Sequence, residues 1–103
     1  MADLKGIQEA VTNGDYQYIL HAVTQMTNRY ISRMDVEQAV LTAEVIEDYP
    51  EDKYDPSCLL YGVTTSRRHL HILASSPPSP VKIITAYEPN PDKWEDYTKR
   101  KDS

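Results

Sequence analysis

The hydrophobic pattern of this chain changes once along its length, directly after Ala43. Before this point apolar residues recur at the three- and four-residue intervals of amphipathic helices. After it they alternate, and β-branched and aromatic residues become common, which is typical of strands. Helices first and strands second is the pattern of an α+β domain with helices packed on one face of a sheet. We therefore predict an α+β fold with N-terminal helices and a C-terminal antiparallel sheet.

Three helices are expected in the first part of the chain. Asp3 can cap a helix over residues 4–13, and Asp15 can cap a second one. Ser32 with Asp35 resembles a capping box that opens a third helix. The residues expected to face the core are Ile7, Ala10 and Val11 on the first helix, Ile19, Val23, Met26 and Tyr30 on the second, and Val36, Ala39 and Val40 on the third, which runs to about Thr42.

Four strands are expected in the second part, joined by short polar turns that suit antiparallel neighbours. The predicted strands cover residues 44–48, 57–64, 69–75 and 81–87. The proline-rich run 75–80 lies between two of them, so we interpret it as a stiff hairpin loop, with a partner-binding motif as the alternative.

The chain after residue 88 is predicted to leave the sheet. Pro89 and Pro91 end the last strand, and Asp92 can cap a short helix that contains Trp94. The three adjacent cations of residues 99–101 are expected to form a frayed terminus, with an RNA-contacting tail as the alternative.

Length and composition indicate a single domain over residues 1–103. The longest uncharged stretch is broken by prolines and is too short for a membrane helix, and the N-terminus lacks the apolar region of a signal peptide, so we expect a cytosolic protein that does not bind membranes. Cys58 is the only cysteine, which excludes an internal disulfide. Its apolar neighbours predict a buried, unreactive thiol.

Charge argues against a general nucleic-acid binder, and no DNA partner is predicted. The formal net charge is −5, whereas attraction to phosphate normally requires a basic balance. The acidity is concentrated in residues 44–55, and the remainder carries equal numbers of acids and bases. A solvated strand end and loop is the favoured interpretation of the acidic segment, ahead of an acidic docking segment.

One cationic cluster interrupts this acidic background. Arg67 and Arg68 lie at a turn, and His69 and His71 follow at the start of a strand, where their side chains share a face. Positive charge concentrated in this way is what a phosphate site requires.

Two other segments offer polar groups that could join this cluster. His21 and Arg29 lie on the polar side of the second helix, which is also explained by solvation alone. Thr85 and Tyr87 share a face of the last strand, and the Tyr87 hydroxyl can donate or accept a hydrogen bond. Cross-strand packing is the competing explanation for both.

Metal and nucleotide cofactors are not predicted. Two histidines at i and i+2 with a third elsewhere could supply zinc ligands, but no His-Glu-x-x-His motif or carboxylate at ligand spacing accompanies them. The three glycines form no phosphate-binding loop and no nucleophile elbow.

Short motifs spread over most of the chain follow one another in a recognisable order. They are His21-Ala22, Met26, Arg29, Ile31-Ser32 and Asp35-Val36, then Glu44-Val45-Ile46-Glu47-Asp48-Tyr49-Pro50, then Arg68-x-Leu70-His71, and finally Ile83-Ile84-Thr85-Ala86-Tyr87-Glu88-Pro89 with Lys93-Trp94. Together they are similar to the signature of a bacterial family known as domain of unknown function 4258, over residues 18–94.

The resemblance implies a fold like that of RelE-type and MqsR-type toxins, in which helices flank a curved antiparallel sheet whose concave face cuts RNA. It implies an endoribonuclease activity with RNA as substrate. Because such toxins are usually neutralised by a small antitoxin, it also implies an antitoxin-like protein partner.

The resulting hypothesis is metal-independent RNA cleavage by acid–base catalysis. His71 or His21 would remove the ribose 2′-hydroxyl proton, and the other histidine would protonate the leaving oxygen. Arg29 and Arg68 would stabilise the phosphorane charge, and Tyr87 would orient the substrate. The residues expected to contact the substrate are Arg67, His69 and Thr85. The alternative is a non-enzymatic module that binds a protein through the same basic strand face.

Overall fold

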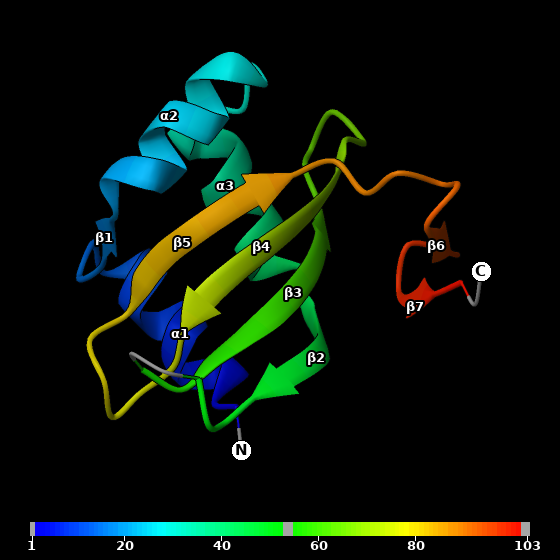
Figure 1. Ribbon diagram of the computed structural model, residues 1–103. Coiled ribbons are helices and arrows are strands. Elements are labelled where there is room, and N and C mark those ends of the chain that lie inside the picture. The colour runs from blue at the N-terminus through cyan, green and yellow to red at the C-terminus, as the bar shows by residue number, and fades with distance from the viewer. Residues whose placement is uncertain (1, 53–54, 102–103) are drawn as a thin grey trace.

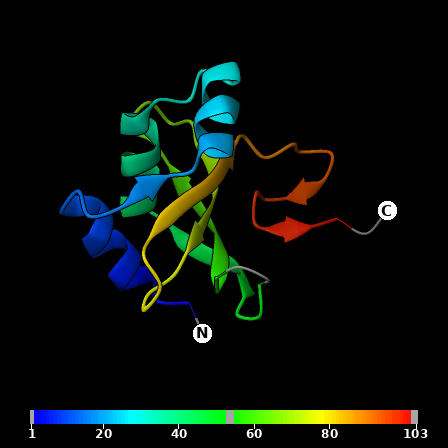
Figure 2. The ribbon, with the colours of Figure 1, turned by 60° about the vertical axis from the view of Figure 1, so that its left-hand side comes forward.

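The computed structural model describes residues 2–52 and 55–101. Within these residues the helices are α1 (Leu4–Thr12), α2 (Leu20–Asn28) and α3 (Arg33–Leu41), and the strands are β1 (Gln17–Tyr18), β2 (Glu44–Tyr49), β3 (Ser57–Val63), β4 (His69–Ser75), β5 (Lys82–Tyr87), β6 (Trp94–Glu95) and β7 (Lys99–Arg100). The helices lie on one side of a twisted sheet and the β6–β7 hairpin lies on the other (Figures 1 and 2). The predicted α+β class is confirmed.

Two of the predicted helix caps are confirmed. The Asp3 side chain accepts a hydrogen bond from the Gly6 backbone at 2.9 Å and so begins α1. Ser32 and Asp35 form both hydrogen bonds of a capping box at the start of α3. These caps satisfy backbone N–H groups that have no partner inside the helix.

The predicted start of the second helix is wrong. Asp15 does not cap α2, which begins at Leu20 with Ile19 in the N-cap position. The intervening residues form β1, which pairs in parallel with β5 through Gln17 and Lys82. Pairing with a strand 65 positions later satisfies the β1 backbone instead, and a local pattern cannot reveal that pairing.

The main sheet has the strand order β1-β5-β4-β3-β2. The neighbours from β2 to β5 are antiparallel, as predicted, and β1 adds a parallel edge strand. The loop between β4 and β5 contains the proline-rich run and closes a hairpin, which confirms that prediction.

The core lies between the sheet and the helices. The helical residues buried there include Ile7, Val11, Ala22, Met26, Val36, Ala39 and Val40. Val23 and Tyr30 were expected on the buried stripe of α2, but they are 47% and 88% exposed. Tyr30 lies beyond the helix end, with a φ angle of 55°, so the helical repeat no longer determines its direction.

The C-terminal segment differs most from the prediction. Asp92 caps no helix; Trp94–Glu95 and Lys99–Arg100 form an antiparallel hairpin instead. Asp96 and Tyr97 reverse the chain with φ angles of 50° and 67°. The cations Lys99 and Arg100 therefore belong to an ordered strand rather than to a frayed terminus.

Candidate functional site

Four polar and aromatic side chains lie on the sheet face that points away from the helices. Tyr61, His71 and Tyr87 are register partners on β3, β4 and β5, and His69 lies two residues before His71 on the same face. We call these four residues the histidine face. The prediction that His69 and His71 share a face is confirmed.

His71 is the centre of the histidine face and is fully buried. Its Nδ1 lies 3.1 Å from the Tyr87 hydroxyl, and its Nε2 lies 2.5 Å from the backbone oxygen of Tyr97 in the hairpin. The Trp94 ring meets the imidazole edge-on, with centroids 4.4 Å apart. Because a carbonyl oxygen only accepts, Nε2 carries the hydrogen and the Tyr87 hydroxyl donates to Nδ1 of the neutral ring. Burial lowers the pKa of His71, which favours this neutral form.

His69 is half-buried beneath the hairpin. The Tyr97 ring stacks on its imidazole, with centroids 4.0 Å apart and planes 4° apart. The Tyr61 hydroxyl lies 2.7 Å from His69 Nδ1 and ties the ring to β3. Tyr61 and Tyr97 are also nearly parallel, at 5.6 Å. Three planar rings therefore lie together at this end of the histidine face.

An ion pair holds the hairpin to the edge of the sheet. Arg100 donates to both carboxylate oxygens of Glu47 on β2, at 2.7 and 3.0 Å, and its guanidinium lies 4.6 Å from the Trp94 ring centroid. The hydrogen bond from Arg100 holds the pKa of the Glu47 carboxyl below its usual range. Five residues of this site were not predicted, because nothing local in the sequence connects β2, β3 and the hairpin: Glu47, Tyr61, Trp94, Tyr97 and Arg100.

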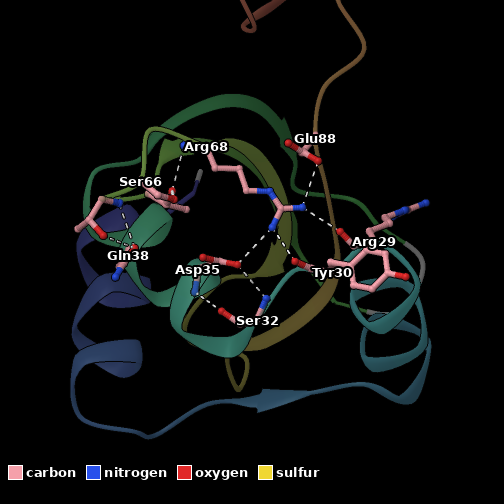
Figure 3. A network of polar contacts seen from close by, with 10 residues as sticks. Arg29, Tyr30, Ser32, Asp35, Gln38, Ser66, Arg68 and Glu88 are labelled. Atoms are coloured by element: carbon pink, nitrogen blue, oxygen red, sulfur yellow. Dashed lines mark hydrogen bonds and ion pairs between the residues drawn. The ribbon is translucent and has the colours of Figure 1, made fainter.

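Arg68 is enclosed in a different network, at the junction of α2, α3 and β5 (Figure 3). Its guanidinium donates to the backbone oxygens of Arg29 and Tyr30, at 2.8 and 2.6 Å. It also contacts the carboxylates of Asp35 and Glu88, at 3.3 and 3.1 Å. With four acceptors around its guanidinium, Arg68 is a clamp that links the end of α2, α3 and the end of β5. The structure does not bring Arg68 to His71.

Arg29 approaches the histidine face from the end of α2. Its Nη1 donates to the Ala86 backbone oxygen at 2.9 Å, and its guanidinium carbon lies 6.0 Å from the Tyr87 ring centroid. In Figure 3 its side chain points away from the Arg68 guanidinium. Of the predicted residues, the structure therefore brings His69, His71 and Tyr87 together on one face, and it places the Arg29 guanidinium beside Tyr87.

The remaining predicted residues lie at the margin of this group or outside it. Thr85 is half-buried opposite Leu73, two register pairs beyond His71 and Tyr87. His21 is exposed on α2, and its side chain makes no hydrogen bond or ion pair within the part of the chain that the structure describes. Arg67 is exposed in the turn before β4, with a φ angle of 67°.

Other features of the molecule offer less chemistry. Cys58 is fully buried, as predicted, and burial raises the pKa of its thiol to about 11. Among residues 2–52 and 55–101, no three His, Cys, Asp or Glu side chains are grouped to hold a metal ion, and no helix is long and apolar enough to cross a membrane. A broad concavity between α1 and the proline-rich turn is lined by Asp3, Glu9 and Asp15, whose charge does not suit phosphate.

Comparison with known proteins gives one result. Neither the curated proteins nor the solved structures include a significant match to this chain. The family described as "Domain of unknown function (DUF4258)" matches residues 18–88, which extend from β1 to the end of β5 and contain the whole histidine face. Since this match covers more than half of the sequence, the chain belongs to the DUF4258 family.

Proposed function

We propose that the protein cleaves RNA at the histidine face, with His71 as the general base. The observation that carries this proposal is the hydrogen bond between His71 and Tyr87, with the Arg29 guanidinium beside the Tyr87 ring. An imidazole held by a hydroxyl group that itself has a cation beside it is an arrangement suited to acid–base chemistry on a phosphodiester. The family match adds no activity of its own.

The reaction uses only groups that RNA and the site supply. When the Tyr97 oxygen leaves Nε2, the His71 imidazole can carry its hydrogen on Nδ1 and donate it to the Tyr87 hydroxyl oxygen. Nε2 then takes the proton from the ribose 2′-hydroxyl, and the freed oxygen attacks the adjacent phosphorus. Arg29 stabilises the negative charge that develops on the phosphorane oxygens. The bond from phosphorus to the 5′-oxygen then breaks, and that oxygen takes a proton from water. The hydroxide formed recovers the proton from His71, so one product ends in a 2′,3′-cyclic phosphate and the other in a 5′-hydroxyl.

The test is cleavage of a mixed-sequence RNA by the purified protein and its His71→Ala variant, both with chelator. A general acid–base group contributes roughly 10²–10⁴-fold, so the variant should lose activity by that factor. Circular dichroism must show that both proteins are folded. Equal rates in the two proteins, or intact RNA in both, would overturn the proposal.

Adding a His21→Ala variant to the same assay shows which group protonates the leaving 5′-oxygen. If His21→Ala cleaves RNA as fast as the wild type, water protonates the leaving oxygen as described. If His21→Ala loses as much activity as His71→Ala, then His21 takes part, as the sequence pattern predicts.

A protein-binding function is the second candidate, and a separate observation favours it. Leu20 is 81% and Tyr30 is 88% exposed, and Val23 between them is 47% exposed. Residues 16–34 contain no acidic residue, although the chain as a whole is acidic. An exposed apolar row on a segment without negative charge suits an acidic amphipathic helix.

The two candidates separate in one experiment. The wild type and a Leu20→Ser, Val23→Ser variant are used to capture protein from an extract of the native cells, and RNA in the same samples is examined. If capture depends on these two side chains while RNA stays intact, the protein is a binding module. If RNA is cleaved equally by both, the histidine face is the functional site.

A further inference from the structure

The β6–β7 hairpin is a separate unit that lies on the histidine face. The family match ends at Glu88, before the hairpin begins. Among the described residues, the hydrogen bonds that join the backbone of residues 91–101 to another backbone group have their partners within residues 90–101. Contact with the main sheet is made by the Tyr97 backbone oxygen, by stacked rings and by the ion pair between Arg100 and Glu47. The hairpin can therefore leave the face without breaking the sheet.

Tyr97 occupies a backbone position that does not favour it. The Thr98 N–H donates to the Glu95 oxygen at 3.1 Å, and the two residues between them have positive φ angles of 50° and 67°. In a β-turn whose two central residues both have positive φ angles, Asp suits the first central position and glycine the second. Asp96 fits this preference and Tyr97 does not. The aromatic ring is kept where glycine would be least strained, and it is this ring that stacks on His69.

The hairpin presents two groups to the histidine face in the way that a nucleotide would. A planar ring lies flat on His69, and a polar oxygen from the same residue meets Nε2 of the proposed general base, His71. Proteins that bind single-stranded nucleic acid stack bases on aromatic and imidazole rings, and the ribose 2′-hydroxyl lies next to the base.

We propose that Tyr97 is a displaceable plug in a nucleotide subsite, where a base of single-stranded RNA would stack on His69 and its ribose hydroxyl would meet His71. The choice of RNA as the ligand rests on the function proposed above. The closed conformation is then a self-inhibited state, because the hairpin and the nucleotide compete for the same two histidines. Glu47 and Arg100 form the latch that holds the plug in place.

The test uses two substitutions of the same residue in the full chain. Tyr97→Gly removes the ring and places the favoured Asp-Gly pair in the turn, so the hairpin is retained while the stacking position on His69 is emptied. Tyr97→Phe keeps the ring and is the matched control. The probe is a labelled single-stranded DNA of about ten nucleotides and mixed sequence, a length within the usual site size, which cannot be cleaved because it lacks the 2′-hydroxyl.

Binding is measured by fluorescence anisotropy. If the plug is closed about nine-tenths of the time, Tyr97→Gly should bind the probe about tenfold more tightly than the wild type, and Tyr97→Phe should match the wild type. Equal affinity of all three proteins, or equal gains in both variants, would overturn the proposal.

The same proteins are then assayed for RNA cleavage, which separates the two proposals. Tighter binding by Tyr97→Gly without cleavage by any protein supports the subsite and refutes the ribonuclease. Cleavage without any gain in affinity supports the ribonuclease and refutes the plug.

Discussion

The chemistry of each predicted residue depends on its surroundings more than on its type. His69 and His71 are two positions apart on one strand, yet one is half-buried beneath a stacked ring and the other is sealed with both nitrogens occupied. Arg67 and Arg68 are adjacent, yet the first is exposed in a turn and the second is held by four acceptors.

His71 should make stability depend on pH. Burial lowers the pKa of its imidazole, so the unfolded chain binds the proton more readily than the folded protein. The stabilisation is complete above about pH 6.5 and falls, by up to about 1.4 kcal/mol per pH unit, until the pH reaches the lowered pKa of the folded state. His71→Gln keeps an N–H donor for the Tyr97 oxygen but does not titrate, so its stability should vary less between about pH 7 and 5.

Urea unfolding of both proteins at several pH values measures this difference. Of the charged groups that act on His71, Glu47 raises its pKa and Arg100 lowers it. The pKa of the Glu47 carboxyl is itself held low, so its own titration lies below about pH 4.3 and outside this range. Parallel stability curves for the two proteins would refute the assignment to His71.

Substitution of Arg68, with the adjacent Arg67 as control, tests whether the contacts of Arg68 stabilise the folded protein. Arg68→Met should lower the free energy of unfolding by about 2–4 kcal/mol, because it leaves two backbone oxygens and two carboxylates without their donor. Arg67→Met, at an exposed site, should change it by less than about 0.5 kcal/mol. Chemical denaturation gives both values, and similar losses would show that Arg68 is not a clamp.

The elements are positioned by a few close approaches between backbones. The clearest is between α3 and β3, where a Cβ added to Gly62 would lie 1.9 Å from the Ala39 backbone oxygen. This contact sets how deeply α3 sits on the sheet, and therefore where its capping residue Asp35 meets Arg68. Helix position and the Arg68 network are consequences of the same packing.

Gly62→Ala should separate α3 from the sheet. Because the obstructing atom belongs to the backbone of α3, we expect a loss of about 3 kcal/mol or more. Gly14→Ala is the control: its added Cβ meets nothing within 4 Å, and its φ angle of 72° alone should cost about 1–2 kcal/mol. Thermal or urea unfolding compares them, and a smaller loss for Gly62 than for Gly14 would contradict the close approach.

At the scale of the whole molecule, the protein consists of one packed body and one attached hairpin. The helices and main sheet share a continuous core, whereas β6 and β7, within residues 2–52 and 55–101, pair only with each other. Figure 2 shows the hairpin on the far side of the sheet from the helices. The hairpin should therefore have lower stability than the body, as local units with few backbone connections do.

The fluorescence of Trp94, the only tryptophan, can show whether the hairpin unfolds before the rest of the protein. Trp94 belongs to β6 and is 6% exposed, with its ring packed against His71, so release of the hairpin moves the ring into water. Its fluorescence should shift to the red at a lower urea concentration than that at which the helical circular dichroism signal is lost. Salt at about 0.5 M should increase the difference between the urea concentrations of the two transitions, because it screens the partly exposed ion pair of Arg100 and Glu47. Coincident transitions at both salt concentrations would show that hairpin and body unfold as one unit.

The sequence was sufficient where neighbouring residues determine the outcome. Asp3, Ser32 and Asp35 cap helices through hydrogen bonds that span three residues, and the strand over residues 69–75 follows from alternation alone. The common face of His69 and His71 follows from the same alternation. These features need no information about the remainder of the chain.

The tertiary structure alone decided the features that join distant segments. The pairing of β1 with β5, the enclosure of Arg68 and the burial of His71 beneath the hairpin each bring together residues far apart in sequence. A local pattern states which atoms can donate, accept or stack, but not which partners will reach them. Thus the sequence by itself indicated His69, His71 and Tyr87 as polar groups of one site. The fold decided that Tyr61 joins them and that Tyr97 covers His69 and His71, because burial and contact are properties of the packed chain.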